Sequence, residues 1–133
     1  MSNRVVHFEI YAQDVERAKK FYSDVFGWEY QKWDFGGQAY WGILTAPKGS
    51  TEHGIDGGLL KRPSQDPTGK DPVIGYCCTV QVVDIDVTIT KIEKAGGTLA
   101  LAKMAIPGMA WQAYYKDTEG NIFGIHEPNV NAK

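Results

Sequence analysis

The feature that most constrains this chain is an internal repeat of one strand–helix unit. Residues 6–16 can be laid over residues 76–86, and in each copy an apolar, strand-like run leads to an Asp that opens an amphipathic helix. The first helix ends at Gly27 and the second at Gly96 and Gly97. Two copies of one unit predict a pseudo-symmetric fold with a shared cleft. His7 of the first copy corresponds to Cys77 of the second, so an imidazole in one copy is matched by a thiol in the other.

The composition predicts a globular protein of one domain. The 133 residues are 43% hydrophobic and 12% aromatic, which supports a real core and argues against disorder. A net charge of −2 offers no electrostatic attraction for nucleic acid or an anionic membrane. No apolar run approaches the ~20 residues that a bilayer-spanning helix needs, and the first residues lack the pattern of a signal peptide.

The cysteine content indicates a reducing compartment. Cys77 and Cys78 are adjacent, and neighbouring Cα atoms lie about 3.8 Å apart, which is too close for a relaxed disulfide. We therefore expect a reduced, cytoplasmic protein.

Period-two and helical patterns place the elements of the first module, which we assign to residues 1–62. Strands are expected at residues 5–11, 29–34, 39–45 and 55–60, with His7, Glu9 and Tyr11 on one face of the first strand. Asp14 is the expected N-cap of the helix, and Gly27 its end. The predicted buried stripe of this helix consists of Val15, Ala18, Phe21, Tyr22, Val25 and Phe26.

The second module, residues 73–133, repeats this order after a polar linker at 61–72 that is rich in Pro and Gly. Strands are expected at 73–82, 98–104, 109–115 and 122–127, and a helix at 84–95 that buries Ile85, Ile89 and Ile92. The predicted fold is α+β, a single domain over residues 1–133 built from two βαβββ modules. Their mixed sheets are expected to pair and curl around a cleft.

Four short motifs carry a resemblance to a known family. They are His7-Phe8-Glu9-Ile10, Arg17-Ala18-x-x-Phe21-Tyr22, Val25-Phe26-Gly27-Trp28 and Asp117-x-Glu119-Gly120-Asn121. In this order and spacing the chain resembles the vicinal oxygen chelate superfamily, which includes glyoxalases, bleomycin-resistance proteins and extradiol dioxygenases. The resemblance extends over residues 5–127.

The resemblance implies a metal site that this sequence does not complete. Family enzymes hold a divalent metal with His or Glu from the first strand of each module and carboxylates or His from the last strands. His7 matches the first position, but Cys77 and Gly124 stand at two others, and only an ambiguous Asp56 is available for the fourth. One imidazole cannot hold zinc, nickel or iron firmly, because catalytic sites use about three protein ligands.

Strand alternation allows a substitute metal site with a different set of ligands. Gly124 and His126 share one face of the last strand, so if Gly124 faces the cleft, His126 does too. His7, Glu9, Cys77 and His126 would then converge, and His7, Glu9 and His126 are the metal ligands we predict for this case. Gly124 would otherwise leave room for an organic ligand where a metal would have been.

His7 and Glu9 are the candidate catalytic residues. They form either a hydrogen-bonded polar pair at the rim of the sheet or a pair that lines the cleft. In the second case Glu9 would be a base or a hydrogen-bond acceptor with His7 as its partner, and desolvation would raise its pKa. Cys77 is either a small apolar filler or a reactive thiol. The predicted ligand-binding residues are Tyr11, Trp41, Cys77, Trp111, Tyr114, Gly124 and His126.

Two functions are consistent with these features. The first is a binding protein of the bleomycin-resistance kind, which holds a small aromatic or amphipathic molecule in the cleft without a cofactor. The second is a glyoxalase-like lyase or dioxygenase that uses zinc, nickel or iron at an altered site around His7, Glu9 and His126. We also expect a homodimer, because the small sheets leave edges that a partner would cover.

Overall fold

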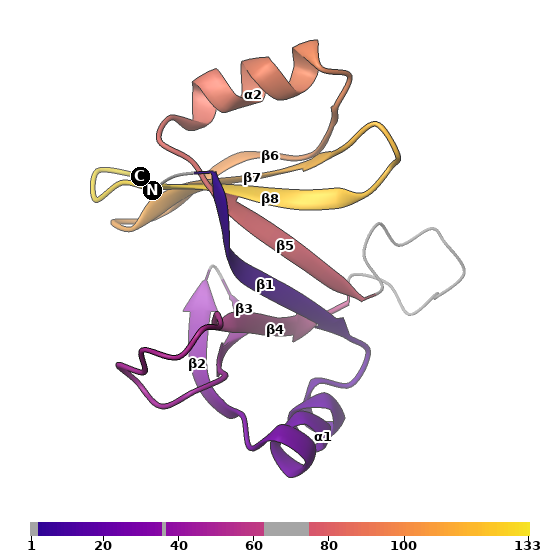
Figure 1. Cartoon of the computed structure of the whole chain (residues 1–133), viewed down its shortest axis with the longest axis vertical. Coiled ribbons are helices and arrows are strands. Elements are labelled where there is room, and N and C mark those ends of the chain that lie inside the picture. The colour runs from indigo at the N-terminus through magenta and orange to yellow at the C-terminus, as the bar shows by residue number, and fades with distance from the viewer. Residues whose placement is uncertain (1–2, 36, 63–74) are drawn as a thin grey trace. The chain divides into compact units, whose positions relative to one another are not determined.

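The computed structural model describes residues 3–35, 37–62 and 75–133 (Figure 1). These residues divide into two compact units. The N-terminal unit runs from His7 to Tyr76, and the C-terminal unit combines Cys77–Lys133 with the residues before His7. The predicted linker lies almost wholly outside the described residues.

The N-terminal unit contains one mixed sheet, which we call sheet one. Its order is β2-β3-β4-β1, with β1 and β4 parallel and the other pairs antiparallel. The chain order is β1 (Arg4–Ala12), α1 (Val15–Phe26), β2 (Glu29–Phe35), β3 (Gln38–Leu44) and β4 (Gly57–Lys61).

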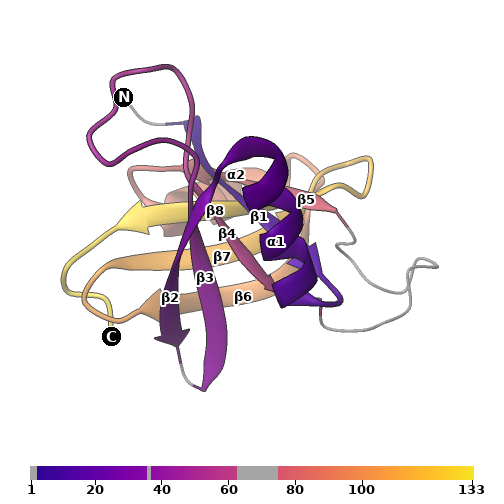
Figure 2. The same ribbon diagram turned by 90° about the horizontal axis from the view of Figure 1, so that it is seen from below.

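The C-terminal unit contains sheet two, whose order is β5-β8-β7-β6. Here β5 and β8 are parallel, and β6, β7 and β8 lie side by side as antiparallel neighbours (Figure 2). The elements are β5 (Tyr76–Gln81), α2 (Ile85–Lys94), β6 (Thr98–Ile106), β7 (Ala110–Lys116) and β8 (Ile122–Pro128). Sheet two thus repeats the connectivity of sheet one, which confirms the α+β class and the βαβββ repeat. The cleft between the modules stays a prediction.

Both helices begin at the predicted caps. The side chain of Asp14 accepts a hydrogen bond from the backbone N–H of Arg17 at 3.0 Å, and Asp84 accepts one from Val87 at 2.9 Å. Each carboxylate satisfies an N–H group that has no partner inside the helix. Helix α1 ends at Gly27, whose φ of 73° is left-handed and suits a residue without a Cβ. Among the described residues, no helix is long and apolar enough to span a membrane.

Each sheet packs a hydrophobic core against its own helix. In the C-terminal unit Ile85 is buried, and Ile89 and Ile92 pack against the same core, as predicted. Its buried members are Val82, Ile85, Ala113, Tyr115 and Ile125. In the N-terminal unit the buried members are Ile10, Ala12, Ile43 and Leu59.

The predicted buried stripe of α1 is too wide. Phe21, Val25 and Phe26 are each more than half exposed, whereas Val15, Ala18 and Tyr22 pack against the core. The indole of Trp28, just after the helix, stacks on the Tyr22 ring with centroids 5.1 Å apart, and it also packs against the core. Trp28 therefore contributes to this core, whereas the last turn of α1 does not.

Candidate functional site

Each sheet has its helix and core on one face, and we call the other face its far face. On β1, Phe8 and Ile10 belong to the core beside α1. Because side chains alternate along a strand, His7, Glu9 and Tyr11 lie on the far face of sheet one. The structure thus groups the three residues of β1 that the sequence grouped.

Tyr40 joins His7 on this face. His7 Nε2 and Tyr40 Oη are 2.6 Å apart and share a hydrogen bond, and the planes of the two rings are nearly parallel, at an angle of 16°. Tyr40 was not among the residues predicted for the site. Alternation requires only that Tyr40 and Trp41 face opposite sides of β3, and the contacts between strands decide which of the two joins His7.

Glu9 is only 4% exposed and lies directly across from Gly58, which in turn lies across from Gly42 on β3. Glutamate is seldom buried to this degree, because desolvating a carboxylate costs several kcal/mol. A Cβ at Gly58 would stand 1.8 Å from Tyr40 Oη, so the phenol group occupies the space above this glycine. Glycine at position 58 therefore lets Tyr40 reach His7.

The far face of sheet two carries a second polar set. Thr79 on β5 lies opposite Gly124 on β8, and Gly124 lies opposite Tyr114 on β7. Cys77 shares the face of Thr79 by alternation and is buried, with Sγ 3.8 Å from the carbonyl oxygen of Ile122.

His126 is oriented by Gln112. Its Nδ1 lies 2.8 Å from Gln112 Oε1, and the two residues are cross-strand neighbours. Because an amide oxygen can only accept, Nδ1 carries the proton, and the neutral ring presents an unprotonated Nε2. Burial lowers the pKa of His126, since a charged imidazolium is harder to desolvate than the neutral ring.

Gly124 allows three side chains to converge. The position of a Cβ on this residue would lie 2.5 Å from Thr79 Oγ1, 2.9 Å from Gln112 Nε2 and 3.2 Å from Tyr114 Cε1. The space above Gly124 is thus shared by a hydroxyl, an amide and an aromatic edge.

The two tryptophans that we predicted as ligand-binding residues both pack against a core beside a helix. Trp41 packs against the core beside α1, and Trp111 against the core beside α2. A lysine ammonium lies over each indole: Lys19 Nζ is 3.4 Å from the ring centroid of Trp41, and Lys103 Nζ is 4.5 Å from the ring centroid of Trp111. Alternation therefore places both on the helix face, opposite to Tyr40 and Gln112.

The donor set does not fit the divalent metal of the family. Across residues 3–35, 37–62 and 75–133, no group of three or more His, Cys, Asp or Glu side chains is placed to hold a metal ion. His7 and Glu9 belong to the N-terminal unit, whereas Cys77 and His126 belong to the C-terminal unit. Neither unit by itself supplies the three donors that a catalytic site needs.

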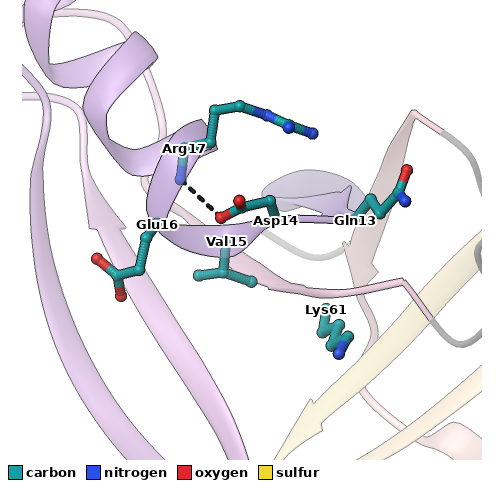
Figure 3. A pocket seen from close by; sticks show the side chains of 6 residues that line it. All are labelled: Gln13, Asp14, Val15, Glu16, Arg17 and Lys61. Carbon is teal, nitrogen blue, oxygen red and sulfur yellow. Dashed lines mark hydrogen bonds between the residues drawn. The ribbon is translucent and has the colours of Figure 1, made fainter.

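A surface hollow at the start of α1 contains none of the predicted site residues (Figure 3). Its lining consists of Gln13, Asp14, Val15, Glu16, Arg17 and Lys61. Since the Asp14 carboxylate already accepts from the Arg17 backbone, the end of the helix is capped by the chain itself.

Comparisons with known proteins agree with this architecture. Residues 4–40 match a family model described as bleomycin resistance protein-like N-terminal. A glyoxylase-like domain-containing protein of Didymella fabae is 30% identical over 131 residues, covering 94% of both chains.

Solved structures show the same fold at low sequence identity. A glyoxalase/bleomycin resistance protein/dioxygenase superfamily member from Vibrio splendidus has a TM-score of 0.62 and 20% identity, covering 93% of this chain and 97% of its own. A methylmalonyl-CoA epimerase from Streptomyces coelicolor, in complex with 2-nitronate-propionyl-CoA, has a TM-score of 0.65 and 16% identity, covering 100% and 99%.

Substituting Gly58 should break the His7–Tyr40 hydrogen bond. In Gly58→Ala the new methyl group meets Tyr40 Oη at 1.8 Å, so the phenol must move, at a cost of about 1–3 kcal/mol in stability. We expect large changes in the NMR signals of the His7 ring and a lower urea midpoint. Gly42→Ala is the matched control, because its nearest contact is Trp33 Nε1 at 3.0 Å. Unchanged His7 signals in Gly58→Ala would contradict this geometry.

His126 should make the stability depend on pH. Its pKa is lower in the folded state than the usual 6.5, so the unfolded chain binds this proton more readily. The free energy of unfolding should therefore fall as the pH drops from 6.5 through the lowered pKa of His126 in the folded state. Below that folded-state pKa it should level off. Urea unfolding between about pH 7 and pH 5 measures this slope. His126→Gln should flatten it, and His53→Gln, at an exposed position, should not. An equal slope in wild type and His126→Gln would refute the assignment.

Proposed function

Because the chain belongs to the glyoxalase/bleomycin resistance/dioxygenase superfamily, we propose that it binds a small aromatic or amphipathic molecule at the far faces of its sheets. In this proposal binding needs no resident metal ion. Membership of the superfamily accounts for the fold, whereas the proposal of a binding function is based on the residues of this chain.

One observation carries the proposal. In the described part of the chain, the buried polar or charged side chains are those of Glu9, Thr79 and Gln112, at 4%, 2% and 6% exposure. All three lie on the far faces, away from the cores that hold the helices. A buried polar group without a hydrogen-bond partner costs free energy, and among these three side chains Thr79 has such a group, since its Oγ1 has no partner among the described residues. Their collection on these faces therefore favours recognition of a ligand.

Apolar groups on the same faces suit a ligand of mixed polarity. Leu101 and Met104 on β6 are 49% and 38% exposed and stand across from Tyr114 and Gln112. Ligand sites typically combine such apolar contacts with a few placed polar groups. The structural neighbour from Streptomyces coelicolor is in complex with 2-nitronate-propionyl-CoA.

A second candidate function is the enzyme, and the burial of Glu9 favours it. A desolvated carboxylate on the same face as the His7–Tyr40 pair is suited to moving a proton. The enzyme would be a glyoxalase-like lyase or dioxygenase with an altered site around His7, Glu9 and His126. We rank it second because the donor set is incomplete within each unit.

Metal analysis separates the two candidates. Protein purified without chelator should contain well under one equivalent of zinc, nickel or iron per chain, and His7→Ala should not change that content. The expected result follows from the shortage of donors, since stable sites need about three or four. A full equivalent of metal that disappears in His7→Ala would favour the enzyme.

Binding of an amphipathic probe tests the proposal directly. Fluorescence titration with anilinonaphthalene sulfonate should show saturable binding. The double variant Leu101→Ala/Met104→Ala should weaken this binding, because it removes apolar contact area on the far face. Val83→Ala, at a residue that is 78% exposed, is the matched control and should leave the affinity unchanged.

Glu9→Gln separates a binder from a catalyst when probe affinity and turnover are measured on the same variant, because a loss of turnover with intact binding would assign Glu9 to catalysis. A binding protein should keep its probe affinity within about threefold, since the amide preserves the shape of the carboxylate. For the apolar contacts, equally strong probe binding in the Leu101→Ala/Met104→Ala double variant and in the Val83→Ala control would refute the assignment of the site to this face.

A further inference from the structure

We infer that the far face of sheet two is a subsite for a neutral carboxamide group attached to an apolar body. This inference rests on the proposed function and specifies the ligand class of that site. Its elements are Thr79, Gln112, Gly124 and His126, all of which belong to the C-terminal unit.

Thr79 is the first indication. Its side chain is 2% exposed, and Oγ1 is buried without a hydrogen-bond partner among the described residues. A buried hydroxyl without a partner is costly, and valine would fill the same volume without that cost. Retaining the hydroxyl therefore favours a partner supplied from outside the chain.

Gln112 provides a second donor at the same place. Thr79 Oγ1 and Gln112 Nε2 lie 2.5 and 2.9 Å from the position that a Cβ of Gly124 would occupy. Gln112 Oε1 is already bound to His126, so Nε2, which only donates, is the end that lies above Gly124. A hydroxyl and an amide N–H that converge in this way suit one acceptor oxygen of a ligand.

His126 provides the complementary acceptor. Since Nδ1 donates to Gln112, the neutral ring presents Nε2 as a lone pair. The set as a whole offers two donors and one acceptor. A carboxamide matches it with one carbonyl oxygen and an N–H group, whereas a carboxylate has no hydrogen for Nε2.

The neighbouring strand supplies the apolar part of the subsite. Leu101 lies across from Tyr114 and Met104 across from Gln112, and both apolar side chains are substantially exposed. An aryl or alkyl group attached to the carboxamide could contact them. Benzamide is therefore a minimal probe, and benzoate is its isosteric anionic control.

NMR titration of the isotope-labelled full chain tests the inference. Benzamide should shift the signals of Thr79, the Gln112 side-chain amide and the His126 ring, and benzoate should bind at least about tenfold more weakly, as expected when one hydrogen bond is lost. Benzoate binding as tightly as benzamide would overturn the inference.

Variants of Thr79 separate recognition from folding. Thr79→Val should weaken benzamide binding about tenfold while the melting temperature holds or rises, because an unpartnered hydroxyl is removed. Thr79→Ser keeps the hydroxyl and should retain binding, and Thr98→Val, at an exposed position on the same sheet, should have no effect. Undiminished affinity in a folded Thr79→Val protein would refute the role of this hydroxyl.

The two levels of the proposal fail differently. If anilinonaphthalene sulfonate binds at Leu101 and Met104 but benzamide leaves Thr79, Gln112 and His126 unshifted, only the carboxamide subsite is refuted. If neither probe perturbs any far-face residue, the proposed binding function is refuted with it.

Discussion

The alternation of side chains across two small sheets, each with one face packed against a helix, is the constraint on which the rest of this structure depends. When a strand residue lies in the core beside a helix, the residues before and after it on the strand lie on the other face of the sheet. Ile10 is held in the core beside α1, so Glu9 and Tyr11 must lie on the far face. Ile125 has the same effect on Gly124 and His126. The hydrophobic cores thus determine which polar side chains can act together.

The two units share a topology but differ in the chemistry of their far faces. Equivalent rows of the sheets read Glu9, Gly58, Gly42 in the N-terminal unit and Thr79, Gly124, Tyr114 in the C-terminal unit. In both rows the last strand contributes a glycine, over which a neighbouring strand places a polar side chain. A metal-ligating side chain at either glycine would collide with that group.

Much of the fold could be predicted because it depends on local chemistry. The caps at Asp14 and Asp84 and the end of α1 at Gly27 follow from hydrogen bonding and backbone freedom within a few residues. The width of the buried stripe of α1 was wrong, because the competing contact comes from Trp28, outside the helix. Helical periodicity describes which residues of the helix share a face, but it does not show which side chains outside the helix pack against the same core.

The candidate site divides in the same way. From the sequence alone it followed that His7 and Glu9 share a face, that His126 accompanies Gly124, and that the family metal set is incomplete. Only the tertiary structure decided that Tyr40 rather than Trp41 joins His7, that Trp111 faces α2, and that Gln112 and Thr79 meet above Gly124. The physical reason is the range of the interactions. Spacing within a strand is set by the backbone itself, whereas register and cross-strand contact depend on how distant segments pack.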